Sequence, residues 1–330
     1  QGERYRHFLQ KVVVRGKIVK VLYFQEQGLE VFLDKLRTQG WLDTFTNTKR
    51  GCSVPELAEF YANCVTNGIV TSSVHGRELC FDADNLGDWL GVPSKGFDVY
   101  VREDKTVLSN DQLLDLTRKL AQQPDLSAPR SVRKGEMQPL HRLLFWFVIK
   151  NVIPRGQGRN LMDSMDMYLT DLLDRGEPIN LPAIMISHIG RIANTSRSHD
   201  LGYGFLLTSV FETLGIPLQK RMGFQVTDEI GSNTLLGCGF QIKKSDGTVL
   251  EQGPKTPFGP GPSPVSIATV SSSTTTVAAL VQDQLHLKEE IAEVKQALTE
   301  EKALNAQRHE DILHALSALT AKLAPSSSSP

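Results

Sequence analysis

The stretch LHRLLFWFV, residues 140–148, decides the fold class, because its apolar residues return at the three- and four-residue steps of an α-helix. Leu140, Leu143, Leu144, Phe147 and Val148 share one face of that helix. Three later segments repeat the pattern, with apolar faces formed by Leu161, Met165, Tyr168 and Leu172, by Leu181, Met185, Ile189 and Ile192, and by Leu207, Val210, Phe211 and Leu214. Four amphipathic helices within residues 137–215 predict a compact helical bundle.

Polar residues at capping positions mark helix starts upstream of the bundle. The tetrapeptides SVPE (53–56) and SNDQ (109–112) have the spacing of a capping box, in which two side chains satisfy free amides of the first turn. We therefore expect helices near residues 54–65 and 110–122. Asp82 is expected to cap a further helix, since the segment that follows it lacks the ligands of a calcium loop.

Strand signals are short and local. Residues 68–72 and 77–81 flank a four-residue turn and predict one β-hairpin, and residues 223–226 and 237–242 are a candidate second pair. Residues 11–24 alternate in a way that leaves strand and helix both open. The sequence thus predicts a mainly α, helical bundle-like globular domain with one or two small β-hairpins.

The composition of the 330-residue chain is that of a globular protein without a strong overall charge. It has 36 Lys+Arg against 37 Asp+Glu, a formal net charge of −1, and 40% hydrophobic residues. These values exclude a wholly disordered chain and a global cationic field directed at nucleic acid or a membrane. The longest apolar run, residues 143–149, is far shorter than the ~20 residues of a membrane-spanning helix, so we expect no membrane partner.

The four cysteines, Cys52, Cys64, Cys80 and Cys238, are too few and too irregularly spaced for a disulfide scaffold. We expect reduced thiols in an intracellular protein, with nucleus and cytoplasm equally open. Because the sequence begins at Gln1 with no apolar signal segment after it, we also expect that its natural start is missing.

The composition changes after residue 252, which we take as the end of the globular domain (1–252). Residues 253–276 are rich in Pro, Gly, Ser and Thr and predict a disordered linker, and residues 325–330 predict a disordered tail. Residues 277–324 predict a coiled-coil helix whose seam consists of Leu280, Leu287, Ile291, Val294, Leu298, Ile312, Leu316, Leu319 and Leu323. We expect it to pair with a second copy or another coiled-coil protein, because a single helix would leave an apolar stripe in water.

The N-terminal segment carries a local positive charge that the overall balance hides. Residues 4–25 contain no acid and six cations, Arg4, Arg6, Lys11, Arg15, Lys17 and Lys20. This basic strip could contact the phosphates of DNA or RNA, and Arg155 and Arg159 could add a second contact. Because the strip lacks regularly spaced aromatic residues for base stacking, nucleic-acid binding is the second of our functional hypotheses.

Four acids in one predicted helix suggest a weaker alternative, a metal-dependent nuclease. They are Asp163, Asp166, Asp171 and Asp174, and their places beside apolar residues favour instead the solvent side of an amphipathic helix. No spacing typical of a zinc site, a phosphate-binding loop or a serine nucleophile occurs, so we assign no catalytic residue, no metal ligand and no cofactor. His188 lies among apolar residues and is expected to be buried and hydrogen-bonded.

An ordered set of segments points to a plant family. They are QGWLDTF (39–45), EFYAN (59–63), GRELCF (76–81), LGVP (90–93), WFVIKNVIP (146–154), DRGEPIN (174–180) and LGIP (214–217). In this order, over about residues 25–220, the chain resembles the “putative plant transposon protein” domain, which many plant chains linked to transposable elements carry. The resemblance implies a plant source and a largely helical domain, and it carries over no catalytic residue.

These observations together favour a protein that is not an enzyme. We expect a transposon-derived, retrotransposon-type protein that acts in protein interaction or assembly through its helical domain and its coiled coil. A structural protein of a retroelement particle would have this layout.

Overall fold

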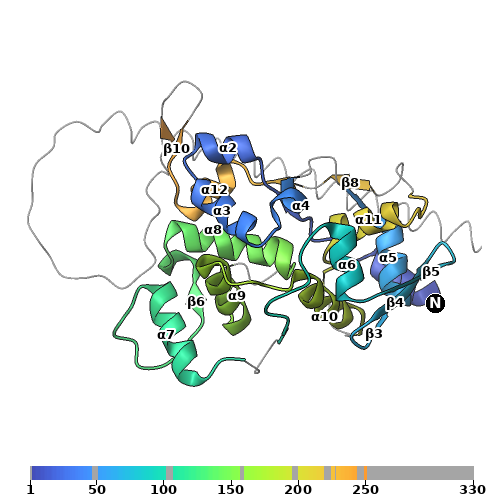
Figure 1. Ribbon diagram of the computed structural model, residues 1–330, viewed down its shortest axis with the longest axis horizontal. Coiled ribbons are helices and arrows are strands. Elements are labelled where there is room, and N and C mark those ends of the chain that lie inside the picture. The colour runs from blue at the N-terminus through green and yellow to red at the C-terminus, as the bar shows by residue number, and fades with distance from the viewer. Residues whose placement is uncertain are drawn as a thin grey trace, which may run out of the picture. The chain divides into compact units, whose positions relative to one another are not determined.

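The computed structural model describes residues 2–46, 51–101, 107–156, 160–194, 200–218, 224–226, 228–243 and 249–250 (Figure 1). All of them belong to one compact unit, Gln1–Thr256. The predicted linker, coiled coil and tail, with all nine seam residues from Leu280 to Leu323, lie outside the described residues. The unit is mainly helical, as the sequence predicts, and its described residues form five small sheets where the sequence predicts one or two β-hairpins.

The four predicted helices of the bundle are present. They are α8 (Pro139–Phe147), α9 (Ser164–Arg175), α10 (Leu181–Asn194) and α11 (Gly204–Thr213), and α8 continues into a π-helical turn, η2 (Val148–Val152). The predicted second helix was placed too early, because Leu161 lies in a strand, β7 (Leu161–Met162). Asp163 ends that strand and caps α9, since its carboxylate accepts a hydrogen bond from the Asp166 amide.

Residues 11–24, for which the sequence left strand and helix both open, contain one of each. The helix α1 (Gly2–Leu9) is followed by a two-residue strand, β1 (Lys17–Ile18), and then by α2 (Val21–Glu26). Two further helices, α3 (Glu30–Thr38) and α4 (Leu42–Thr46), complete this part.

Two of the three predicted caps form as expected. Asp82 caps α6 (Ala83–Leu90) with Asn85, and Ser109 caps α7 (Asn110–Ala121) with Gln112. The capping box predicted for α5 (Val54–Asn63) is wrong, because the Ser53 hydroxyl donates to the Glu56 carboxylate instead of accepting from a backbone amide.

The first predicted hairpin is present, with its first strand two residues later than predicted and a turn of two residues in place of four. Strands β4 (Val70–Val74) and β5 (Arg77–Phe81) pair antiparallel, and β3 (Val65–Thr66) extends them to three strands. His75 and Gly76 both have positive φ, which gives the two-residue turn a twist that matches its strands.

The second predicted pair is wrong, because its two halves join other partners. Strand β8 (Phe224–Val226) pairs with β2 (Gly51–Ser53). Of residues 237–242, Gly237 and Cys238 are the last residues of the helix α12 (Ser232–Cys238), and Ile242 begins the strand β10 (Ile242–Lys243). Gly239 ends α12 with φ 95°. The other small sheets join β1 to β9 (Asp228–Glu229) in parallel, and β6 (Val132–Arg133) to β7 and β10 to β11 (Val249–Leu250) antiparallel.

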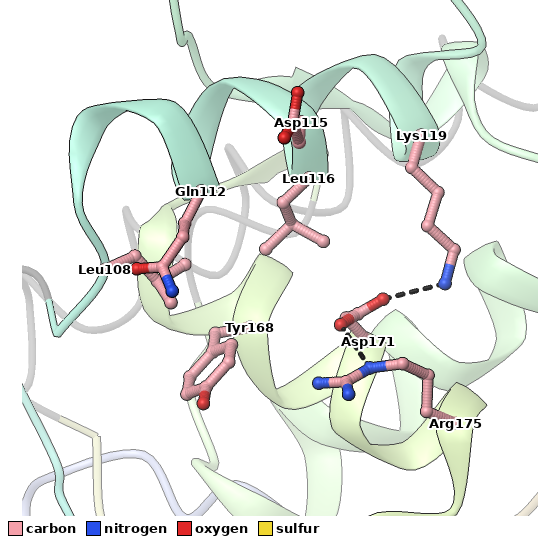
Figure 2. A pocket seen from close by; sticks show the side chains of 8 residues that line it. All are labelled: Leu108, Gln112, Asp115, Leu116, Lys119, Tyr168, Asp171 and Arg175. Atoms are coloured by element: carbon pink, nitrogen blue, oxygen red, sulfur yellow. Dashed lines mark hydrogen bonds and ion pairs between the residues drawn. The ribbon is translucent and has the colours of Figure 1, made fainter.

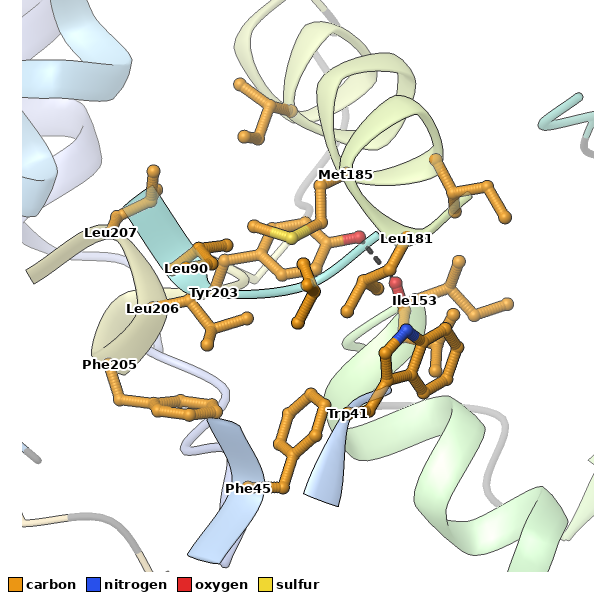
Figure 3. Close-up of a cluster of buried hydrophobic side chains, with 14 of the residues drawn as sticks. Trp41, Phe45, Leu90, Ile153, Leu181, Met185, Tyr203, Phe205, Leu206 and Leu207 are labelled. Carbon is orange, nitrogen blue, oxygen red and sulfur yellow. Dashed lines mark hydrogen bonds between the residues drawn. The ribbon is translucent and has the colours of Figure 1, made fainter. Parts of the chain in front are cut away.

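Aromatic side chains fill the main core. Phe147 of α8 meets Phe45 edge to face with ring centres 5.0 Å apart, and it meets Phe32 at 5.8 Å. Figure 3 shows Trp41 and Tyr203 in the same core. A smaller core, of Leu116, Leu120, Ala121, Val132, Met137, Phe145, Ile149, Met162 and Met167, attaches α7 to α8 and α9.

Removing the Phe147 ring should therefore destabilise the domain strongly. We expect Phe147→Ala to lower the free energy of unfolding by about 3–5 kcal/mol, because transfer and cavity costs add at a fully buried aromatic residue. Leu22→Ala is the matched control, since Leu22 is 75% exposed and its truncation should change the value by less than about 0.5 kcal/mol. Urea unfolding measures both, and equal losses would contradict the central place of Phe147.

Candidate functional site

The four acids of α9 do not share the solvent side of the helix, so that expectation is wrong. Asp166 is fully buried and Asp171 is buried, whereas Asp163 and Asp174 are partly exposed. Buried carboxylates require partners, because desolvation of an isolated charge is costly. The cations that pair with Asp166 and Asp171 lie outside the predicted helix or at its far end, and the apolar pattern of the sequence does not indicate these pairs.

Asp166 is held by Arg155 in a two-pronged ion pair. Arg155 Nη1 lies 2.6 Å from Asp166 Oδ1, and its Nη2 donates to Oδ2, which also accepts from the Asp163 amide at 2.9 Å. The Arg155 side chain is only 16% exposed. Arg155, a candidate phosphate contact, is therefore committed to the interior, and Arg159 lies outside the described residues.

Asp171 and Asp174 meet the side chain of Lys119 from α7. Lys119 Nζ lies 2.7 Å from Asp171 Oδ1 and 3.1 Å from Asp174 Oδ2. Arg175 Nε donates to the second Asp171 oxygen at 2.8 Å. Asp174 also receives His141 Nε2 of α8 at 3.2 Å and lies 3.6 Å from Lys35 Nζ of α3. The two acids thus join three other helices to α9.

The electrostatics of Asp174 follow from these partners. Burial alone would raise the pKa of Asp174, but hydrogen bonds from Lys119 and His141 outweigh it and lower that pKa. Burial likewise works against the charge of Lys119, and its bonds to Asp171 and Asp174 raise its pKa. Within the described residues, no group of three or more His, Cys, Asp or Glu is placed to hold a metal ion.

The basic strip does not form one free cationic surface. Strand β9 places Asp228 3.5 Å from Arg15 and 2.8 Å from Lys17, and Glu229 2.6 Å from Lys20. Burial opposes ionisation of Asp228, yet the hydrogen bond from Lys17 lowers the pKa of Asp228 below its usual value. No local sequence signal could reveal these acids, which lie about two hundred residues later in the chain.

The rest of the strip is split between surface and interior. Arg4 donates to the Ala193 carbonyl at 2.8 Å. Lys11 Nζ is buried and lies 4.7 Å from the centre of the Phe8 ring. Burial lowers the pKa of Lys11. Arg6 is exposed.

Besides His141, two more histidines are structural partners. His188 is buried as predicted, and its Nδ1 lies 2.9 Å from the Tyr203 hydroxyl, which donates to the Val152 carbonyl at 2.7 Å. Because the phenol has one proton, His188 Nδ1 is the donor to Tyr203. The sequence did not reveal the second case, in which His75 Nε2 lies 2.8 Å from the fully buried Glu56 carboxylate.

The arrangement of Ser53, Glu56 and His75 is not a catalytic triad. In a triad the histidine stands between serine and acid, so that it can take the hydroxyl proton. Here the carboxylate stands in the middle, and the Ser53 side chain is fully buried. The contact instead fastens the β4–β5 turn to α5.

An open cavity of about 340 Å³ lies between α7 and α9, beside the α9 acids (Figure 2). Its walls are formed by Leu108, Gln112, Asp115, Leu116, Lys119, Tyr168, Asp171 and Arg175. A second, more open hollow of about 630 Å³ lies beside β9 and the start of α12. None of the described helices is long and apolar enough to cross a membrane, and the four cysteines are free thiols, with Cys80 alone exposed among them.

Charge should make the Asp174 contacts dependent on pH. A carboxylate whose folded-state pKa is lowered stabilises the fold above its unfolded pKa and loses this effect as pH falls through the folded pKa. We expect Asp174→Asn to cost about 1–2 kcal/mol in unfolding free energy at pH 7, with the difference from wild type shrinking as the pH falls below 3.8, the usual aspartate pKa, and through the lowered folded-state pKa. Asp115→Asn, at a 75% exposed side chain, should cost less than about 0.5 kcal/mol. A pH-independent loss for Asp174→Asn would contradict the ion-pair account.

The His75 contact can be tested apart from the unusual backbone at that residue. His75 has φ 50°, a left-handed conformation that is unfavourable for alanine and glutamine alike, so comparing these two variants largely cancels the backbone cost. We expect His75→Ala to be about 1.5–3 kcal/mol less stable than wild type, because Glu56 loses a donor, and His75→Gln to recover part of that loss because its amide can donate. Urea unfolding at pH 6 compares the two, and identical stabilities for Ala and Gln would refute the bond to Glu56.

Comparison with known proteins gives one result. A family model described as “Putative plant retrotransposon-related domain” matches residues 37–217, more than half of the chain. The match runs from the end of α3 through α11 and so includes α7, α9 and the cavity between them. It lies within the span that the sequence motifs indicated and confirms that resemblance. No similar curated protein and no similar solved structure was found.

Proposed function

The chain belongs to the plant retrotransposon-related domain family, and from this premise we propose that it is a non-enzymatic, transposon-derived protein that acts in protein interaction or assembly. The proposal assigns two parts to this role. The helical domain presents a rigid surface, and the predicted coiled coil at 277–324 brings chains together.

The observation that carries the proposal is that the acids of α9 are paired with lysine and arginine side chains. Asp166 binds Arg155, Asp171 binds Lys119 and Arg175, and Asp174 binds Lys119. A two-metal nuclease would need such carboxylates to converge on a shared ion. Carboxylates engaged by Lys and Arg favour a structural role, and the nuclease hypothesis is the weakest of the three.

Nucleic-acid binding is the second candidate and rests on the exposed part of the basic strip. Arg4 and Arg6 are exposed on α1. Asp228 and Glu229 offset the charges of Arg15, Lys17 and Lys20, which reduces the field that phosphates would meet. Because so few cations would contact phosphates, the binding constant would fall only slightly as the salt concentration rises.

Oligomeric mass tests the leading proposal directly. We expect light scattering to give a dimer or larger species for residues 1–330 and a monomer for residues 1–252, because the coiled coil supplies the association. In the full chain, Leu287→Glu together with Ile291→Glu should return the mass to that of a monomer. Glu289→Gln is the matched control on the charged flank and should leave the oligomer intact. Monomeric masses for both lengths would remove the proposal's assembly part.

A further inference from the structure

We propose that the cavity between α7 and α9 binds a small organic carboxylate with an apolar body. The cavity holds about 340 Å³, near the lower end of the range for ligand sites in proteins. A ligand of this volume is small, so few groups decide what it can be. The argument rests on which hydrogen-bonding groups face the space and which are already used.

Most of the acceptors around the cavity are occupied; an exception is the second oxygen of Asp115, a 75% exposed side chain, which has no hydrogen-bond partner among the described residues. Both oxygens of Asp171 accept bonds, one from Lys119 at 2.7 Å and one from Arg175 at 2.8 Å. The Gln112 side-chain oxygen accepts from the Ser109 amide at 2.9 Å, as part of the α7 capping box. Asp115, at the rim, accepts from Arg118 at 3.2 Å.

The donors that remain face the cavity. Within the described residues, the Gln112 side-chain amide nitrogen and Arg175 Nη2 have no hydrogen-bond partner, and Arg175 Nη1 has only a long contact of 3.5 Å to Glu177. Figure 2 shows the Arg175 guanidinium directed from Asp171 toward the Tyr168 ring, with the Gln112 amide above the same ring. Unpaired donors beside mostly paired acceptors favour a ligand that brings acceptors, and a guanidinium favours a carboxylate.

The remaining wall is apolar and fixed in place. Leu116 is buried in the smaller core, and Leu108 and Tyr168 pack against that core. Phe97 meets the Tyr168 ring edge to face with centres 4.9 Å apart, which holds the ring in its orientation. The Nε bond to Asp171 orients the Arg175 guanidinium, whose side chain is 46% exposed. A held ring beside an oriented guanidinium suits a ligand with an aromatic or branched body next to its carboxylate.

Methyl NMR on the full chain with labelled leucine tests the site, with 3-phenylpropionate as the probe. We expect saturable shifts of the Leu108 and Leu116 methyl signals. Two control ligands should each bind at least about tenfold more weakly than 3-phenylpropionate. The alcohol 3-phenylpropan-1-ol lacks the carboxylate, and acetate lacks the apolar body. Equal binding of the alcohol, or no saturable shift with up to about 20 mM phenylpropionate, would overturn the proposal.

Variants separate the cavity from general charge effects. Arg175→Gln should weaken phenylpropionate binding at least about tenfold, whereas Arg37→Gln, which removes an exposed arginine paired with Glu30 and Asp34 on α3, should leave it unchanged. Gln112→Phe places a ring in the cavity and should abolish the shifts, and it decides the matter if Arg175→Gln fails to fold. Unchanged binding in folded Arg175→Gln, or in Gln112→Phe, would refute the site.

Discussion

A carboxylate in a protein interior needs hydrogen-bonding or cationic partners, and this constraint organises the helical domain. Helix α9 buries two acids and partly buries a third, and their partners come from α3, α7, α8 and the segment after η2. Desolvation of both charges offsets much of their attraction, so a buried pair adds little net stability, but removing one partner leaves an uncompensated charge. The acids therefore fix where the neighbouring helices can lie.

The apolar core acts together with this charge network. Phe147 lies against Phe32 and Phe45, so α8 is packed on the N-terminal helices, while its other end is tied to α9 through His141. The smaller core then attaches α7, and Lys119 fixes that helix where it approaches Asp171. The cavity exists because α7 and α9 are joined at these points and leave room between them (Figure 2).

Much of the helical part of the fold follows from the sequence, because helix formation and capping are local. The pattern at Leu140–Val148 and the caps at Asp82 and Ser109 depend on residues within a few positions of one another. Ser53 shows the limit of such rules, since its hydroxyl binds Glu56, which in turn binds His75 of the hairpin turn. The burial of Asp166 and Asp171 was equally hidden, because an acid's place on a helix does not reveal a distant cation. The family, by contrast, was recognisable from ordered motifs that need no contacts.

The parallel pairing of β1 with β9 has a consequence for synthesis. Lys17 and Asp228 are 211 residues apart in the chain, and the β2–β8 pair closes a loop of similar scale. A ribosome makes the N-terminal partner first and the C-terminal partner last, so neither sheet can close until nearly the whole domain has emerged. Contacts of such long range also slow folding, because loop closure must precede the gain from pairing. The nascent chain therefore exposes the edges of β1 and β2 for most of its translation, which makes this the interval in which a chaperone would matter most.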